Sequence, residues 1–218
     1  MKNIIYRAKY IYQHEGPAVL LRQIALFISQ HVFQYGHYYL YEHTMAERDE
    51  NDFIPKIKDF TLHKVTSAEQ ADELLGQGYD MYALSINTRK RLARGAVAFC
   101  IFIGKELAHI GWLALTEEAM RSFEPFPYIV NFSEKEACTG GTFTTPKYEG
   151  NGLMKYGYFK RFQFLAEHGI LRSRNAVNVK NVASQKVHAK FNPRRYAEAR
   201  YLKILWWQSW KEKEYNIK

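Results

Sequence analysis

Cysteine is scarce in this sequence, and long apolar runs are missing. Only Cys100 and Cys138 occur among the 218 residues, too few for the disulfide framework of a small secreted domain. The longest unbroken apolar run of the N-terminal region, residues 24–28, is far shorter than the roughly 20 residues of a membrane-spanning helix. No secretory signal pattern is visible. We therefore expect a cytoplasmic protein with no transmembrane segment.

The histidines and cysteines also lack the spacing of a metal site. No two histidines stand four residues apart on a predicted helix, and there is no Cys-x-x-Cys pair. We expect no metal. Hydrophobic residues make up 47% and charged residues 24% of the chain, which is typical of a globular protein with a real core.

Positive charge is concentrated at one end of the chain. The net charge is +9, and residues 145–218 hold 16 Lys and Arg against 5 Asp and Glu, whereas residues 1–144 hold 15 against 17. So uneven a field indicates a polyanionic partner near the C-terminal third. A nucleotide cofactor, a nucleic acid, an acidic carrier protein and an anionic lipid all fit this charge.

Residues 1–58 are predicted to form an N-terminal helical extension. Residues 17–34 fit a helix that starts at Pro17 and carries an apolar stripe, and residues 45–59 fit an acidic linker. The helix could cover an acceptor site, form a dimer interface or lie on a membrane surface. Its only charged residue is Arg22, so packing or dimerisation is favoured over a membrane surface.

Residues 59–218 are predicted to form one domain of alternating strands and helices. The clearest helix is residues 152–168, where an apolar face is followed by the stop at Gly169. Strands are expected at 61–65, 96–103, 107–115, 137–144, 171–179 and 199–210, and further helices at 67–76, 80–94 and 181–190. We interpret the tryptophans of the last strand, Trp206, Trp207 and Trp210, as sheet-packing residues.

The segment most informative about function is residues 142–154, TFTTPKYEGNGLM. They read as a strand, a turn with Gly150 and Gly152, and the start of the long helix. A helix N-terminus has unpaired N–H groups and partial positive charge, which suit a phosphate, and glycines let a ligand approach the main chain. An ordinary capped turn without a ligand is the alternative that this fragment alone leaves open.

This arrangement resembles the GNAT superfamily of acyl-CoA N-acyltransferases over about residues 60–210. The family pattern before the cofactor helix is Arg or Gln, two residues, Gly, one residue, then Gly or Ala. The matching residues here are Glu149, Gly150, Asn151, Gly152, Leu153 and Met154. A later family pattern of Asn, a small residue and an aromatic is matched by Asn181, Ser184 and His188. The likeness does not extend to residues 1–58.

Three residues depart from the family pattern. Glu149 replaces Arg or Gln and would repel a pyrophosphate unless its side chain points to solvent. Met154 replaces a small residue. His188 stands where the family commonly has the Tyr that protonates the departing thiolate.

The resemblance implies direct transfer of an acyl group from acetyl-CoA, or another acyl-CoA, to a primary amine. The cofactor-binding residues it implies are Phe143, Thr144, Gly150, Asn151, Gly152, Leu153, Met154, Asn181 and Ser184. His188 is the candidate acid; the alternative is that Asn181 is an ordinary N-cap and His188 a partly exposed histidine. Glu136 is the first candidate base, followed by His109 and Glu117. Cys138 has no His partner in sequence, so it reads as a buried hydrophobe.

We thus expect an α/β (α+β) fold with a GNAT-like, mostly antiparallel central sheet flanked by helices. The acceptor is expected to be a small-molecule amine. The overall organisation of the chain resembles that of GNAT enzymes of bacterial polysaccharide biosynthesis, and this resemblance favours an amino sugar or sugar nucleotide. An acyl carrier protein (ACP) as donor, a homodimer, and a degenerate binding module without catalysis stay open. No nucleic acid is expected as a partner.

Overall fold

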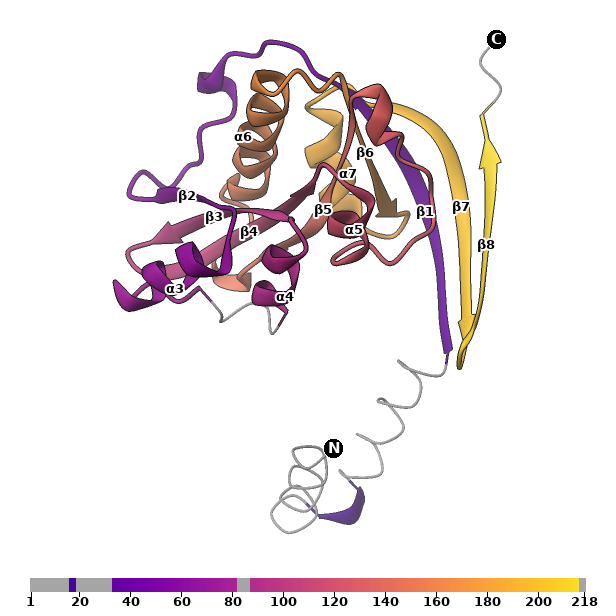
Figure 1. The fold of residues 1–218 in the computed structure, drawn as a ribbon, viewed down its shortest axis with the longest axis horizontal. Coiled ribbons are helices and arrows are strands. Elements are labelled where there is room, and N and C mark those ends of the chain that lie inside the picture. The colour runs from indigo at the N-terminus through magenta and orange to yellow at the C-terminus, as the bar shows by residue number, and fades with distance from the viewer. Residues whose placement is uncertain (1–15, 19–32, 82–86, 216–218) are drawn as a thin grey trace.

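The computed structural model describes residues 16–18, 33–81 and 87–215, which are built around one eight-stranded sheet (Figure 1). The strands follow the order β2-β3-β4-β5-β6-β1-β7-β8. Their bounds are β1 Phe33–Thr44, β2 Thr61–Val65, β3 Val97–Ile103, β4 Glu106–Ala114, β5 Glu136–Thr144, β6 Arg172–Asn178, β7 Arg194–Ile204 and β8 Trp207–Glu214. Neighbouring strands are antiparallel except for β5 and β6, so the predicted mixed, mostly antiparallel sheet is confirmed.

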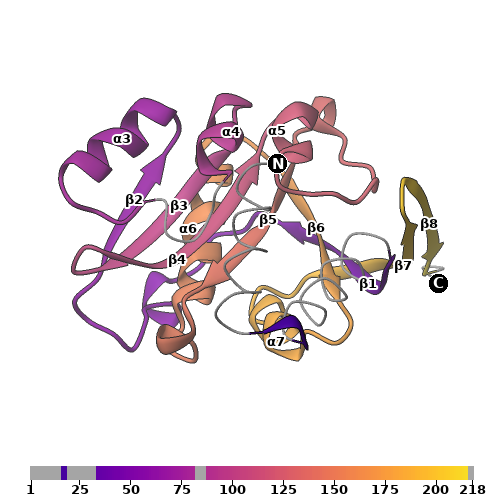
Figure 2. The same ribbon diagram turned by 90° about the horizontal axis from the view of Figure 1, so that it is seen from below.

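Helices cover both faces of this sheet. They are α3 Ala68–Gly76, α4 Thr88–Ala93, α5 Glu117–Arg121, α6 Leu153–Glu167 and α7 Val182–Ala189, with short 3-10 turns η1 Glu50–Asp52, η2 Phe132–Glu134 and η3 Pro146–Tyr148. Figure 2 shows α3, α4 and α5 on one side of the sheet, with α6 and α7 on the other. Within the described residues, no helix is long and apolar enough to cross a membrane.

Strand β3 explains why the sheet needs cover on both sides. Its side chains alternate between two buried clusters: Ala98, Cys100 and Phe102 pack with α3, α4 and α5, while Val97, Phe99 and Ile101 pack against α6. A strand buried on both faces reads as a continuous apolar run. That run is the pattern from which residues 96–103 were predicted.

The N-terminal region differs from the prediction. Residues 33–44, expected within the helical extension, form β1, which lies inside the sheet between β6 and β7. Its aromatic residues favour a strand, and Leu40 is fully buried in the core. The sheet domain therefore starts at or before Phe33, and the expected boundary at residue 58 is wrong. Residues 19–32 of the predicted helix lie outside the described residues.

The expected acidic linker also packs on the domain. Phe53 is buried against α6, and Glu50 accepts a hydrogen bond from the hydroxyl of Tyr156 (2.7 Å) and pairs with Lys160 (2.9 Å). Residues 45–59 thus run along α6 as an ordered segment. One acidic residue of the expected linker, Glu50, thus pairs with a basic residue of this helix.

The expected last strand is a hairpin of two strands. Strands β7 and β8 are joined by a turn at Leu205 and Trp206. Trp210 packs against Phe126, with ring centroids 5.2 Å apart, as predicted. Trp206 and Trp207 are exposed, so their predicted role in sheet packing is wrong. In the expected helix 80–94, the helical part is α4, and residues 82–86 lie outside the described residues.

Candidate functional site

The two parallel strands of the sheet separate part way along their length. Strands β5 and β6 pair at three positions, of which the last is Cys138 with Arg174. Next to this pair, the hydroxyls of Thr139 and Ser173 are bonded at 2.9 Å. From there β5 stays with β4, and β6 stays with β1. The strands therefore open into a V whose inner edges have no ladder partner.

Glycines allow β5 to bend away from β6. The pairing of β5 with β4 shifts between Ile110 and Trp112, and Gly141 has the positive φ of +54° that favours glycine. Gly111, at the same irregularity, leaves room for a buried guanidinium: a Cβ there would lie 2.6 Å from Arg161 Cζ. Two glycines thus shape the opening.

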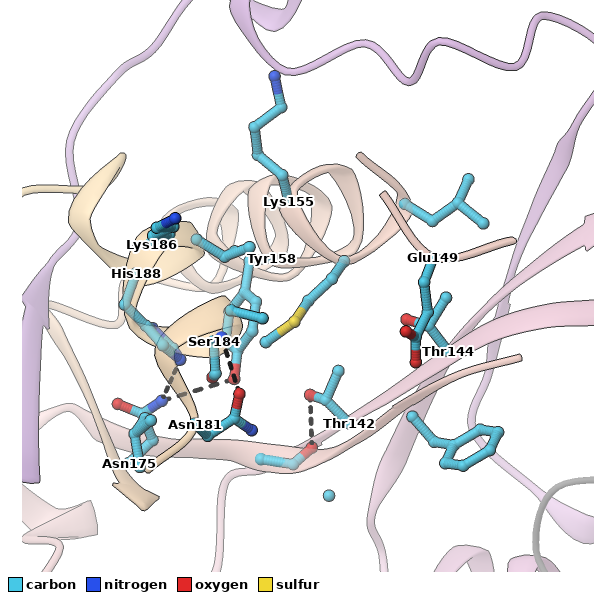
Figure 3. Close-up of a pocket in the computed structure, with 18 of the residues that line it drawn as sticks. Thr142, Thr144, Glu149, Lys155, Tyr158, Asn175, Asn181, Ser184, Lys186 and His188 are labelled. Carbon is cyan, nitrogen blue, oxygen red and sulfur yellow. Dashed lines mark hydrogen bonds between the residues drawn. The ribbon is translucent and has the colours of Figure 1, made fainter. Parts of the chain in front are cut away.

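A cleft of about 720 Å³ occupies this opening and continues to the N-terminus of α6 and along α7 (Figure 3). Eight of the nine residues predicted to bind the cofactor line it. They are Phe143, Thr144, Gly150, Gly152, Leu153, Met154, Asn181 and Ser184. Residues distant in sequence are therefore brought to one site, although their role in binding stays a prediction.

The turn before α6 has the conformation that its glycines permit. Gly150 and Gly152 have φ values of +75° and +84°, and the N–H of Tyr156 is bonded to the carbonyl of Gly152 (3.0 Å). The N–H groups of the first helical turn therefore have no acceptor within the helix and lie at the wall of the cleft. Asn151, the ninth predicted residue, does not line it. Its side chain donates to the carbonyls of Tyr148 and Glu149 and so holds the turn in shape.

Charges of both signs surround this helix N-terminus. Lys186 and Lys190 of α7 line the cleft. Lys155 points away from it in Figure 3 and donates to the carbonyl of Asp52 (2.5 Å). Glu149 lines the cleft and is also exposed to solvent. The site thus keeps a carboxylate next to the amides that suit an anion.

Only part of the polar face of helix α7 lines the cleft. Asn181 is its N-cap, with the side-chain oxygen accepting from the N–H of Ser184 (3.0 Å). Gln185 instead donates to the carbonyl of Val179 (2.8 Å). Asn181 and Ser184 therefore line the cleft, and Gln185 ties the helix to the end of β6.

His188 lies at the wall of the cleft but is fully buried. Asn175 Nδ2 is 3.0 Å from its Nε2, and His43 Nε2 is 3.0 Å from its Nδ1. We assign the ring as neutral, accepting from the amide and donating to His43. Burial, with His43 and Arg161 adding to it, lowers the pKa of His188 well below its usual value. A buried ring with both nitrogens engaged has no proton directed into the cleft, so the structure favours another residue as the acid.

Glu136 is a structural ion-pairing residue. One carboxylate oxygen accepts from Arg172 (3.0 Å) and Arg174 (2.9 Å), and the other accepts from the N–H of Asn131 (2.8 Å). It is buried at the closed end of the β5–β6 opening and does not line the cleft. The prediction that it acts as the base is therefore wrong.

The other two candidate bases also lie outside the cleft. His109 is buried beneath α6 with Nδ1 2.8 Å from Thr144 Oγ1, and burial, aided by Arg161, lowers its pKa to about 3. As a neutral ring, it supports β5 through its contact with Thr144. Glu117 is on α5 and pairs with Arg121 one turn on (3.3 Å). Neither side chain lines the cleft.

Glu124 is the acidic residue that the sequence analysis missed. It follows α5, is 6% exposed and lines the cleft next to Gly140, where a Cβ would lie 3.4 Å from its Oε2. Burial raises the pKa of its carboxyl to about 7, against the lowering effect of hydrogen bonds from the N–H of Phe126 and the hydroxyl of Tyr128. A carboxyl group with this pKa is suited to proton transfer at neutral pH. Nothing in its sequence context, FEPFP, marks it.

Tyr158 is a second missed residue. It projects from α6 into the cleft (Figure 3), and its hydroxyl is 3.5 Å from Asn175 Nδ2. The guanidinium of Arg161 lies 3.8 Å from the ring centroid and is buried with Nη2 unpartnered. The cation lies over the ring face in a cation–π contact, which holds the ring in place. In sequence, Tyr158 was one of several residues on the apolar face of the helix.

Other side chains have structural roles. Cys138 is buried, and its Sγ lies 3.3 Å from the hydroxyl of Tyr128. Burial raises its pKa, which makes it a poor nucleophile. Among the described residues, no group of three or more His, Cys, Asp or Glu side chains is placed to hold a metal ion.

Comparison with known proteins identifies the fold. No protein-family model matches the chain, and no curated protein matches it in sequence. Among solved structures, a tandem GNAT protein from the clavulanic acid biosynthesis pathway is 15% identical, with a TM-score of 0.50 over 89% of this chain and 59% of its own. A GNAT-family acetyltransferase from Colwellia psychrerythraea is 15% identical (TM-score 0.47, 83% of this chain, 59% of its own). A GCN5-related N-acetyltransferase-like protein from Streptococcus suis is 12% identical (0.46, 87% and 67%).

At such identities the likeness concerns the fold alone. The tandem GNAT protein shows that the chain has the GNAT fold. The chain spans 59% of that protein's length. Its activity, substrates and partners do not follow from the fold.

Proposed function

We propose that the protein is an N-acyltransferase that moves an acyl group, most simply acetyl, from acyl-CoA to a primary amine. The observation that carries this proposal is the cleft between β5 and β6, which joins the N-terminus of α6 to the unpaired edge of a strand. The first feature suits a diphosphate, and the second suits an extended pantetheine arm and a thioester. One cleft serves both requirements.

The binding roles follow from position. Main-chain N–H groups of residues 152–154 would hold the diphosphate, and Lys186 and Lys190 would add positive charge at the rim. Asn181 and Ser184 would bond the pantetheine arm. At the inner edge of β5, the N–H of Thr144, which faces away from β4, would point to the oxygen of the thioester carbonyl, where negative charge develops during attack, with Phe143 beside it.

Glu124 and Tyr158 would move the protons. The amine nitrogen forms a bond to the acyl carbon and the carbon–sulfur bond breaks, with the electron pair leaving on sulfur. Glu124 takes the proton that the nitrogen loses, and the Tyr158 hydroxyl supplies a proton to the thiolate. Both side chains line the same cleft. They replace Glu136 and His188 in these roles.

The acceptor class rests on resemblance alone. An amino sugar or sugar nucleotide of polysaccharide biosynthesis, a cytoplasmic location and a homodimer stay part of the proposal as expected from sequence. The decisive experiment is calorimetric titration with acetyl-CoA, followed by an assay of CoA thiol release over a panel of primary amines. We expect binding and amine-dependent release. Absence of binding at millimolar acetyl-CoA would contradict the proposal.

Glu149 favours a second candidate, an acyl-ACP donor. A carboxylate at the wall of the cleft opposes a diphosphate, whereas the phosphopantetheine of a carrier protein has a single phosphate. The basic C-terminal third suits the acidic surface of such a carrier. Turnover of acyl-ACP with none of acyl-CoA would select this donor.

A further inference from the structure

The first residues of β1 and the turn that joins β7 to β8 carry exposed apolar side chains at one end of the sheet. Trp206, in the turn between β7 and β8, is 87% exposed, and Trp207 is 53% exposed. We call the whole group the aromatic tip; it consists of Phe33, Tyr35, Ile204, Leu205, Trp206 and Trp207. In Figure 1 this end of the three strands projects away from the labelled helices α3 to α7.

Strand register places much of the tip on one face. Phe33 is opposite Ile204, which is opposite Trp207, so these three side chains share a face of the sheet. The next rung, Gln34, Lys203 and Gln208, is polar and points to the other face. The end of the sheet is therefore amphipathic.

The same face becomes basic further from the tip. Four residues along each strand, Arg200 lies opposite His37 and Lys211, about 14 Å from the Ile204 rung. Arg200 and Lys211 are exposed. The nearby acidic group, Glu198, is bonded to His37 (3.2 Å) and to the Tyr215 hydroxyl (3.2 Å). Beyond this point α7 covers the face, where Tyr41 stacks on His188.

We propose that the aromatic tip docks on a lipid membrane that carries anionic headgroups. Tryptophan and tyrosine favour the headgroup level of a bilayer, and cations set behind them meet the phosphate groups. The protruding turn with Trp206 at its end suits insertion into such a surface. The excess of positive charge in residues 145–218 has the matching sign.

The cleft ends close to the proposed docking face. The N–H of Val179 is bonded to the carbonyl of His37 (2.9 Å), and the adjacent residue Asn178 lines the cleft. The cleft thus ends beside the basic rung of the docking face. Membrane binding does not depend on acyl transfer, so it can be tested independently of the proposed function.

Cosedimentation of the full chain with vesicles tests this proposal. We expect binding to vesicles of phosphatidylcholine mixed with phosphatidylglycerol, weaker binding to phosphatidylcholine alone, and a decrease with added salt. The double variant Trp206→Ala/Trp207→Ala should bind at least about tenfold more weakly. The matched control, Ile129→Ala/Leu171→Ala, removes exposed apolar side chains elsewhere and should bind as the parent does. Circular dichroism would verify that both variants fold.

The basic rung gives a separate readout. Arg200→Gln and Lys211→Gln should each lower affinity for the anionic vesicles about fivefold and leave the weak binding to phosphatidylcholine unchanged. Failure of the parent protein to bind anionic vesicles, or equal binding by the tryptophan variant, would overturn the proposal. So would a parent dimer that becomes monomeric in the tryptophan variant without any vesicle binding, because the tip would then be a contact between two copies of the chain.

Discussion

Cys138 of β5 pairs with Arg174 of β6, and beyond this pair the two parallel strands separate. The position of this last pair determines which residues face the cleft. Glu136, two residues earlier, is enclosed by the arginines of β6, whereas residues 140–144 border the opening. The proposed chemistry of the protein depends on this separation.

Glu124→Gln should lower kcat/KM about 10²- to 10⁴-fold, because the amide cannot take the proton from the amine. In the parent, kcat/KM should rise with pH as the Glu124 carboxyl, with its pKa of about 7, loses its proton. That rise should be missing in the variant. Steady-state kinetics against pH measure both effects, and calorimetry should show unchanged binding of acetyl-CoA. A variant that keeps the parent's rate and pH profile would exclude Glu124 as the base.

Glu149→Gln should tighten CoA binding about threefold to tenfold, because it removes a carboxylate from the wall that would hold the diphosphate. Glu167→Gln, at the other end of α6, is the matched control and should have little effect. Titration calorimetry at low salt measures the difference. Weaker binding by the Glu149 variant would show that this carboxylate supports the ligand.

Tyr158→Phe and His188→Phe should differ in kind. Loss of the phenol hydroxyl should lower kcat about a hundredfold with little change in the free energy of unfolding. Loss of the His188 ring nitrogens should leave His43 and Asn175 without their partner and lower the free energy of unfolding by about 1–3 kcal/mol. Denaturant unfolding and turnover assays on both variants distinguish the roles. The reverse pattern would restore His188 as the acid.

Buried histidines should make the protein less stable in acid. The pKa values of His43 and His109 are about 3, lowered first by burial, and that of His188 is also lowered. The unfolded chain takes up these protons near pH 6.5, whereas the folded chain resists taking them up. The free energy of unfolding is therefore largest above that pH and decreases as the pH falls toward 3. Each histidine contributes up to about 1.4 kcal/mol per pH unit. His109→Asn should reduce the slope of unfolding free energy against pH by about one proton.

Much of the fold could be predicted because its signals are local. The strand at 61–65 was predicted with its observed bounds, Ser67 caps the next helix as predicted, and the helix after Gly152 has the stop expected at Gly169. Residues 33–44 were missed because their partners, β6 and β7, lie far away in sequence. An aromatic segment after a helical pattern gives no local sign of where it will pair.

The candidate site likewise contains residues that local sequence signals identified and residues that depend on tertiary packing. The Gly-x-Gly turn and Asn181 were found because motif spacing is a property of consecutive residues. Glu124 and Tyr158 were missed because burial and the direction of a side chain are set by tertiary packing. Glu136 and His109 looked suitable by residue type, yet ion pairs and burial commit both to the support of β5.

A crystal structure at saturating CoA tests the central claim most directly. We predict the diphosphate on the main-chain N–H groups of residues 152–154 and the sulfur between β5 and β6, near Glu124 and Tyr158. CoA bound elsewhere, or a cleft still empty at millimolar CoA, would contradict the account.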